Sequence, residues 1–305
     1  MYPIIEVPAG SAQSTEHLGT KPKFWFRDSE SVWSLCKLAR PNTGEDWSEK
    51  VAAEIAGLLG LPHAHYDLGV FEGNDCIVSP RCFPDDCALI HGNELLGQLD
   101  PGYGVVNRYR ATAHTLEIVW SALEKVRCDL PIGWPRLPGI HSPADVFVGY
   151  LLLDALIGNT DRHHQNWGIV EAPDELAPRR YLAPTFDHAS CLGCHLTEEA
   201  RARRLATKDR QFTPEAYAER ARSAFYSDVT AQQPMLTTEA FRRAAAAFPT
   251  AANIWRTKLQ GLQPGQIDAI LNSLPPHRFS GRSHDFARRV LLHNRERVLS
   301  MADEQ

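Results

Sequence analysis

The sequence predicts an α+β fold in which a small strand-rich part, residues 1–85, precedes a larger helical part, residues 86–305. Short apolar runs bounded by turn residues occur mainly before residue 85 and are typical of strands. One helical segment interrupts them, and helical periodicity dominates the rest of the chain. With 305 residues, 43% of them hydrophobic, the chain is long enough for one two-lobed unit or two small domains.

The first elements are two strand-like runs, residues 23–27 and 32–39, on either side of the turn 28–31. Lys37 lies inside the second run, where a charge indicates a side chain that points at a ligand. A lysine that reaches water from the strand edge is the alternative. A helix over residues 46–59 follows, and two further strands are expected at 66–71 and 76–80.

From Asp86 onward the pattern is helical, with helices expected at 111–127 and 144–158. Ser142 is a suitable N-cap for the second helix, and Pro143 suits its first position. A strand pair, 167–170 and 181–183, is then expected around a polar turn. The remaining helices are expected at 197–205, 214–224, 238–248, 251–259, 265–274 and 283–300.

The most informative motif is Gly158-Asn159-Thr160-Asp161-Arg162-His163-His164-Gln165-Asn166, followed by Thr185-Phe186-Asp187. Phosphoryl transfer needs one carboxylate near the incoming hydroxyl, and an amide and a second carboxylate that hold magnesium. Asp161 is therefore the candidate base, and Asn166 and Asp187 are the candidate metal ligands. Ordinary loop and capping residues are the alternative for each of them taken alone.

ATP binding also needs a strand lysine and a helix glutamate that positions it. Lys37 is the candidate lysine, and Glu49 and Glu54 are its candidate partners, which lie five residues apart and cannot both face one cleft. The segment 17–23 is the candidate phosphate loop. Gly19 permits close approach of the backbone to phosphate, and Thr20 and Lys21 could donate hydrogen bonds. Residues from Arg81 to Asp85 are expected to form the hinge that meets the adenine.

These motifs resemble the catalytic and metal-binding segments of HipA-like serine/threonine kinases, and Asp161-Arg162-His163-x-x-Asn166 is also similar to the catalytic loop of phosphatidylinositol kinases. The resemblance implies a two-lobed protein-kinase-like fold that uses ATP and Mg²⁺, with Asp161 as base, Asn166 and Asp187 as magnesium ligands and His163 in the catalytic loop. Residue 188 is His, where common protein kinases have Phe followed by Gly. The HipA-like group is expected to differ there.

The resemblance further implies a protein serine or threonine as phosphate acceptor, with autophosphorylation on Ser11, Ser14, Thr15 or Thr20. It implies a toxin–antitoxin or signalling setting with an antitoxin-like regulator. Because the candidate phosphate loop lies close to residue 1, we expect no counterpart of the extra N-terminal subdomain of full-length HipA. Two alternatives stay open: a kinase for a small alcohol such as an antibiotic, sugar or inositol derivative, and a pseudokinase that serves as an interaction module.

Composition excludes several other classes of protein. A net charge of −5 gives no electrostatic basis for general nucleic-acid binding. The longest apolar run, residues 146–158, is interrupted by Asp154 and is too short to span a bilayer. No basic start precedes an apolar segment at the N-terminus, so we expect a cytoplasmic protein without a secretion signal.

Two further patterns lie after Asp187. Cys191-Leu192-Gly193-Cys194-His195 has the spacing of a haem-attachment motif. Because no export signal is expected, we interpret these residues as a flexible part of the activation segment rather than as a haem or zinc site. A solvated helix face is expected for the basic residues that follow, with contacts to an acidic or phosphorylated partner as the alternative. They are Arg201, Arg203, Arg204, Lys208 and Arg210.

Overall fold

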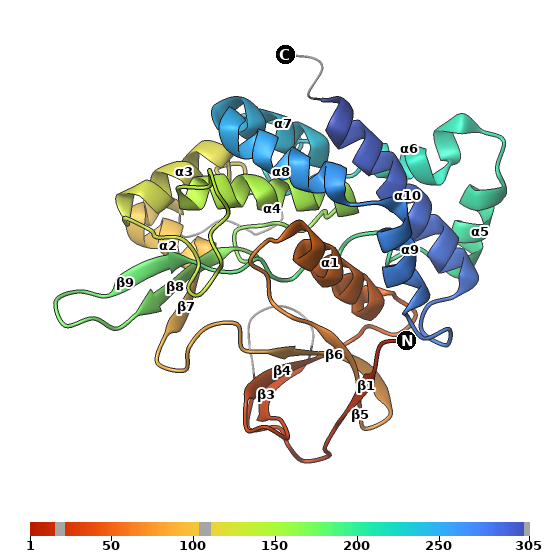
Figure 1. Cartoon of the computed structure of the whole chain (residues 1–305), viewed down its shortest axis with the longest axis horizontal. Helices are drawn as coiled ribbons and strands as arrows, with labels where there is room; N and C mark the ends of the chain where they lie inside the picture. The colour runs from red at the N-terminus through yellow and green to blue at the C-terminus, as the bar shows by residue number, and fades with distance from the viewer. Residues whose placement is uncertain (16–21, 104–110, 302–305) are drawn as a thin grey trace.

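The structure is a computed structural model that describes residues 1–15, 22–103 and 111–301. A β-sheet with one helix forms the N-terminal region, and a layer of helices lies on the far side of that helix (Figure 1). A small hairpin sheet projects from the helical region beside them (Figure 1). The predicted α+β class, with a β-sheet N-terminal region and a helical C-terminal region, is confirmed.

The N-terminal sheet has six strands in the order β1-β5-β6-β4-β3-β2. Its strands are β1 (Ile4–Val7), β2 (Ser14–Thr15), β3 (Lys23–Arg27), β4 (Trp33–Leu38), β5 (Asp67–Phe71) and β6 (Asn74–Pro80). Strand β1 runs parallel to β5, while the other neighbours are antiparallel. The central four strands match those expected from the sequence, whereas β1 and β2 were missed.

The two faces of this sheet have different surroundings because side chains alternate along each strand. Phe24, Phe26, Cys36, Cys76 and Val78 form a buried cluster on one face. On the other face, Lys37 lies opposite Ile77 in the register of β4 and β6. The cluster therefore supports the sheet from behind and leaves the lysine on the face toward α1.

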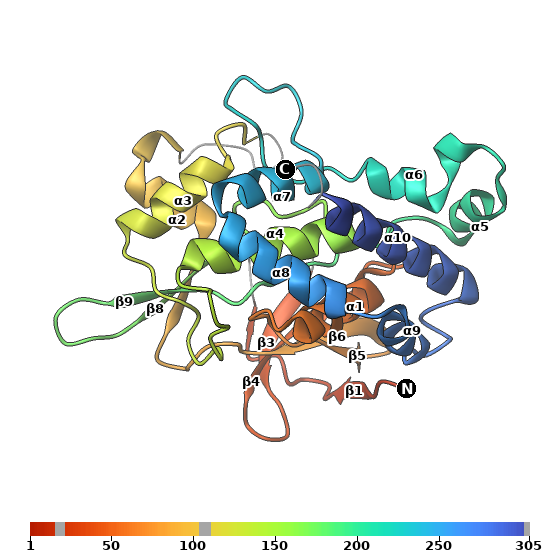
Figure 2. The same cartoon turned by 45° about the horizontal axis from the view of Figure 1, so that its top comes forward.

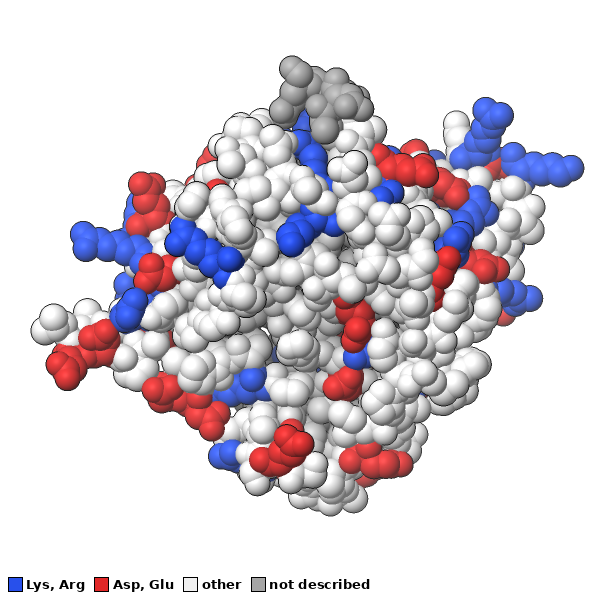
Figure 3. Space-filling model, viewed as in Figure 1, with Lys and Arg blue, Asp and Glu red and all other residues white. Residues whose placement is uncertain are grey.

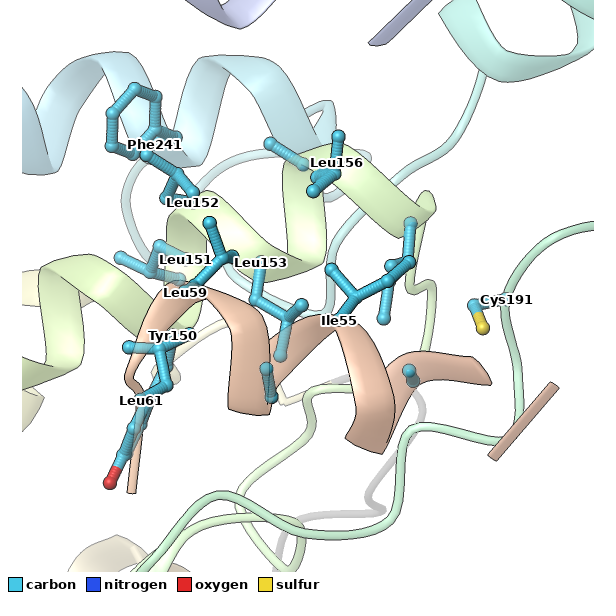
Figure 4. Close-up of a cluster of buried hydrophobic side chains, with 14 of the residues drawn as sticks. Ile55, Leu59, Leu61, Tyr150, Leu151, Leu152, Leu153, Leu156, Cys191 and Phe241 are labelled. Carbon is cyan, nitrogen blue, oxygen red and sulfur yellow. The ribbon is translucent and has the colours of Figure 1, made fainter. Parts of the chain in front are cut away.

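Helix α1 (Glu45–Leu59) follows the sheet and ends at Gly60, which has a left-handed conformation with φ of 75°. Val51, Ile55 and Leu59 on its apolar face are completely buried. They join the main core together with side chains of the helical region. Figure 4 shows Ile55 and Leu59 of α1 against the leucines of the next long helix. Helix α1 is thus fixed between the sheet and the helices.

That helix is α4 (Pro143–Ile157), which lies at the centre of the helical region in Figures 1 and 2. It begins with the expected cap, since the Ser142 side chain accepts from the Asp145 N–H and the Asp145 carboxylate accepts from the Ser142 N–H. Every residue from Val146 to Ile157 is buried, including Asp154. Because α4 is surrounded by protein, its C-terminal end gives a rigid start to the loop that follows.

A second sheet of three strands holds the other side of that loop. Its order is β7-β8-β9, with β7 (Ala88–His91), β8 (Gly168–Ala172) and β9 (Arg179–Leu182). The hairpin of β8 and β9 was expected. The helical pattern expected from Asp86 is wrong for Ala88–His91, because this short segment supplies the hydrogen-bonded edge that β8 requires.

The C-terminal region has further helices, several of which pack against α4 (Figure 2). They are α2 (Gly92–Leu99), α3 (Leu116–Lys125), α5 (Glu198–Ala206), α6 (Pro214–Glu219), α7 (Thr237–Ala247), α8 (Pro249–Gly261), α9 (Pro264–Asn272) and α10 (Gly281–Ser300), with 3₁₀ turns at Pro101–Tyr103 and Arg210–Phe212. The expected helices 111–127 and 214–224 were too long, since α3 begins after the cap Thr115 and α6 ends at Glu219. No helix in the described ranges is apolar enough over sufficient length to cross a membrane.

Candidate active site

A cavity of about 710 Å³ opens between the two sheets. The N-terminal sheet contributes Lys37 to its lining, the segment after β6 contributes Arg81 to Phe83, and the loop after α4 contributes Asp161 and Asn166. Asp187 and the segment that follows it form another wall. The residues that the sequence singled out from distant segments therefore line one space, whose size suits a nucleotide.

Lys37 lies between two carboxylates on the floor of the cavity. Its Nζ contacts Asp187 Oδ1 directly and lies 3.9 Å from Glu49 Oε2. Burial lowers the pKa of Lys37, but the charges of Asp187 and Glu49 more than offset this effect, so the pKa is raised and the amine stays charged. Glu54 lies elsewhere, with its Oε1 2.7 Å from Lys50 Nζ. Between the two candidate partners, the structure brings Glu49 to Lys37.

Asp187 has an unusual backbone conformation, with φ of 57°. Its N–H donates to the Tyr66 hydroxyl over 3.1 Å, and the next N–H, that of His188, donates to Glu49 Oε1 over 2.6 Å. A left-handed conformation at a residue other than glycine is costly and persists where the surroundings fix it. Tyr66 and Glu49, both from the N-terminal region, therefore hold the backbone around Asp187.

The loop after α4 is fixed to that helix by a buried ion pair. Arg162 is completely buried, and its Nε and Nη2 donate to the two carboxylate oxygens of Asp154 over 2.9 and 2.8 Å. Its Nη1 donates to the carbonyls of Asn166 and Phe186 over 2.9 and 3.4 Å. One guanidinium thus joins α4, the catalytic loop and the segment that carries Asp187.

The same carboxylate extends the support toward Asp161. Asn159 Nδ2 donates to Asp154 Oδ1 over 2.8 Å, and Asn159 Oδ1 accepts from the Asp161 N–H over 3.1 Å. Asn166 Nδ2 donates to the Asp161 carbonyl over 2.7 Å, which fixes the orientation of the Asn166 amide group. The side chains of Asp161 and Asp187 are 34% and 33% exposed, so both carboxylates reach the solvent of the cavity.

The remaining candidates are placed as follows. His163 lines the cavity with Nε2 3.7 Å from Asp161 Oδ1, and its Nδ1 accepts from the Gln165 N–H over 3.1 Å. Arg81 lines the cavity beside the hinge, where its Nη2 donates to the Cys87 carbonyl over 2.6 Å. Gly19, Thr20 and Lys21 lie outside the described residues.

The segment after Asp187 differs from expectation. Cys191 and Cys194 are 2% and 1% exposed, because the segment packs against α1 and α4. The Ala189 carbonyl accepts from Ser48 Oγ over 2.6 Å, and the Cys194 carbonyl accepts from the Gly44 N–H over 2.8 Å. The expectation of a flexible segment is wrong for these two cysteines, since both side chains are buried in the main core.

Part of the basic run is also buried. Arg201 is 5% exposed, and its Nη2 donates to the carbonyls of Gly193 and Cys194 over 3.0 and 3.4 Å. The guanidinium of Arg204 stacks on Phe212, 4.2 Å from the ring centre. The expectation of a solvated helix face is therefore wrong for these two residues, because one holds the segment after Asp187 and the other packs on an aromatic ring.

Solved structures with a similar fold include two that align over nearly the whole of this chain. The Helicobacter pylori proinflammatory kinase CtkA aligns over 99% of this chain and 98% of its own, with 17% identity and a TM-score of 0.74. The HipA protein of Shewanella oneidensis MR-1, known from its toxin–antitoxin complex with HipB and operator DNA, aligns over 98% of this chain and 68% of its own, with 13% identity and a TM-score of 0.59. The fold is that of a HipA-like kinase. No protein-family model and no curated protein matches the sequence.

The HipA-like kinase fold explains the separation of the site residues along the chain. The N-terminal sheet and α1 supply Lys37 and Glu49, while the helical region supplies Asp161, Asn166 and Asp187. Sequence reasoning did not identify Asp154, Tyr66 and His188, which hold these groups in place. A carboxylate inside the apolar helix α4 was the one signal that could have pointed to Asp154.

Proposed function

We propose that this protein is a kinase that uses ATP and Mg²⁺ to phosphorylate a serine or threonine hydroxyl of a protein and that it phosphorylates itself. One observation carries the proposal: Lys37, Asp161, Asn166 and Asp187, from three separate segments, line one cavity, and Glu49 of α1 lies beside Lys37. A pseudokinase has no need to keep all of these groups together. The HipA-like fold supports the same reaction class.

The residues present fit a magnesium ion. Asn166 and Asp187 offer an amide oxygen and a carboxylate, which are oxygen ligands of the kind that Mg²⁺ prefers. Both line the cavity, and the amide nitrogen of Asn166 is already used by the Asp161 carbonyl. When bound, the ion would neutralise the charge of the triphosphate.

The protein's own groups account for the rest of the proposed mechanism. Lys37, whose raised pKa keeps it charged, would hold the α- and β-phosphates. Asp161 would accept the proton of the incoming hydroxyl or orient it. The buried pair of Arg162 and Asp154 would keep Asp161 in position, since catalysis of phosphoryl transfer depends on positioning together with electrostatic stabilisation.

The proposed acceptor, a protein serine or threonine, follows from the HipA-like resemblance. A cytoplasmic location is consistent with the same resemblance. All seven cysteines are free thiols in the structure, as expected for a reducing compartment. Positive and negative side chains are interspersed over the face shown in Figure 3, which fits a soluble enzyme rather than a nucleic-acid surface. Because HipA forms a complex with HipB and DNA, an antitoxin-like regulator is part of the proposal.

The direct test is the intact mass of the protein after incubation with ATP and Mg²⁺, compared with Asp161→Asn and Asp187→Asn. We expect phosphate on the wild type and on neither variant, and peptide mapping then locates the acceptor. Ser11, Ser14 and Thr15 are the candidates in the described part of the chain, whereas Thr20 lies outside it. Radiolabelled ATP added to a cell lysate shows whether other proteins are also labelled.

Two outcomes would contradict the proposal in different ways. Label that appears on small molecules and never on protein would favour an alcohol kinase on the same fold. Absence of any Mg²⁺-dependent ATP turnover in the wild type, with no label on any acceptor, would favour a pseudokinase.

A further inference from the structure

His188 directly follows Asp187 and has no solvent exposure. Its ring lies between Thr185 on its own segment and Glu49 on α1. Glu49 is also completely buried, and Thr185 is 2% exposed. Three buried polar side chains therefore connect the candidate metal-binding segment to the helix that faces Lys37.

The hydrogen bonds of this group determine which ring nitrogen carries a proton. His188 Nδ1 lies 3.3 Å from Glu49 Oε1, and His188 Nε2 lies 2.8 Å from Thr185 Oγ1. A carboxylate only accepts hydrogen bonds, so Nδ1 is the donor in the first contact. In the neutral ring Nε2 then accepts from the Thr185 hydroxyl. The Thr185 backbone is itself fixed, since its N–H donates to the Pro62 carbonyl over 2.9 Å.

The two oxygens of Glu49 have separate partners. Oε1 accepts from both the backbone N–H and the ring of His188, over 2.6 and 3.3 Å. Oε2 lies 3.9 Å from Lys37 Nζ and has no hydrogen-bond partner among the described residues. Two donors on one oxygen fix the plane of the carboxylate, and they thereby direct the other oxygen toward Lys37.

Asp187 is constrained by the same contacts. Its left-handed φ of 57° is followed at once by the N–H that Glu49 accepts. A strained backbone of this kind remains in place only when neighbouring groups hold it. The ring of His188 adds a second connection between this short segment and Glu49.

We propose that His188 is a positioning residue that, through Glu49 Oε1 and its own backbone, sets both the carboxylate of Asp187 for magnesium and Glu49 Oε2 for Lys37. This inference rests on the proposed function. Residues in the outer shell of metal sites change metal affinity by roughly 10–100-fold when they are replaced. His188 contacts no substrate, so it acts through Asp187 and Glu49 alone.

The test measures binding of a non-hydrolysable ATP analogue by calorimetry at increasing Mg²⁺ concentrations. For His188→Leu we expect a rise of about tenfold in the Mg²⁺ concentration that produces half of the full increase in affinity for the analogue. In the absence of Mg²⁺, the affinity of this variant for the analogue should fall by a smaller factor. His188→Asn keeps an N–H near the position of Nδ1 and should return the Mg²⁺ requirement most of the way to that of the wild type.

The matched control is His114→Asn, because His114 is equally buried, has both ring nitrogens bonded and does not line the cavity. This control should lose stability without a change in the Mg²⁺ requirement. If His188→Leu does not fold, Thr185→Val should shift the requirement in the same direction by a smaller factor.

Three results decide between the explanations. An unchanged Mg²⁺ requirement in the folded His188 and Thr185 variants would overturn the inference alone. An equal shift in His114→Asn would reduce the role of His188 to general stability. A wild type that shows no Mg²⁺-dependent binding of the analogue would overturn the proposed function, and the inference with it.

Discussion

Removing one partner of the ion pair between Asp154 and Arg162 should destabilise the protein far more than removing one partner of a surface pair. Arg162 and Asp154 are 0% and 3% exposed at their side chains, and their closest atoms are 2.8 Å apart. Burial lowers the pKa of Arg162, but the Asp154 carboxylate more than offsets it and the pKa is raised, so the guanidinium keeps its charge. Asp154→Asn would leave that charge buried without compensation.

The expected magnitude follows from that burial. Removing one partner of a buried pair costs about 3–5 kcal/mol, a large share of a typical free energy of unfolding of about 5–15 kcal/mol. At roughly 2 °C per kcal/mol for a large domain, the midpoint of thermal unfolding should fall by about 8 °C. Urea unfolding followed by circular dichroism measures the free energy directly.

The control and the refutation use a second pair of the same type. Arg288 makes the same two-pronged contact with Asp268, but their side chains are 38% and 32% exposed. Asp268→Asn should therefore cost no more than about 1 kcal/mol. A double variant, Asp154→Leu with Arg162→Met, should recover stability relative to Asp154→Asn because no charge remains buried. A loss of less than about 1 kcal/mol in Asp154→Asn would refute the reasoning.

Three further changes test other parts of the structure. Glu49→Gln should weaken nucleotide binding by about tenfold, whereas Glu54→Gln, which affects the distant Lys50, should leave calorimetric affinity unchanged. A Cβ on Gly168 would lie 2.3 Å from the Ile90 carbonyl oxygen, so Gly168→Ala should lower the free energy of unfolding by about 1–3 kcal/mol. Gly261→Ala, with no atom within 4 Å of the added Cβ, should not lower it, and urea unfolding compares the two. Burial lowers the pKa of His114 to about 3, below the unfolded value of about 6.5, so its contribution is complete above pH 6.5 and declines by about 2 kcal/mol on acidification to pH 5. His114→Asn should reduce that slope, and an identical slope in the variant would contradict the assignment.

The sequence was sufficient where a signal lies within one segment. Lys37 was identified because a charge inside an apolar strand needs a reason, and the motif from Asp161 to Asn166 because its spacing serves phosphoryl transfer. The choice between Glu49 and Glu54 could not be made, since it depends on which face of α1 meets the sheet. The roles assigned to these residues stay predictions until the proposed experiments are performed.

Features that depend on contacts between distant segments were missed or misread. Strand β7 has four residues, too few for a clear period, and it exists because β8 needs a neighbour. The contact between Glu49 and His188 spans 139 positions of the chain, so no local pattern predicts it. Cys191 and Cys194 were expected in a flexible segment, yet they are buried in the core that α1 and α4 form.

The same long-range contacts bear on how the cleft is assembled. Arg278, 1% exposed, lies 3.3 Å from Asp46 of α1, while Gly44 and Ser48 donate from the other side to the segment after Asp187. Helix α1 is therefore held at its N-terminal end from two directions. These contacts within the chain keep Glu49 beside Lys37. The guanidinium of Arg162 is already bonded to the Asp154 carboxylate and to two backbone carbonyls. The position of Glu49 relative to Lys37 is accordingly set by contacts of buried residues around α1.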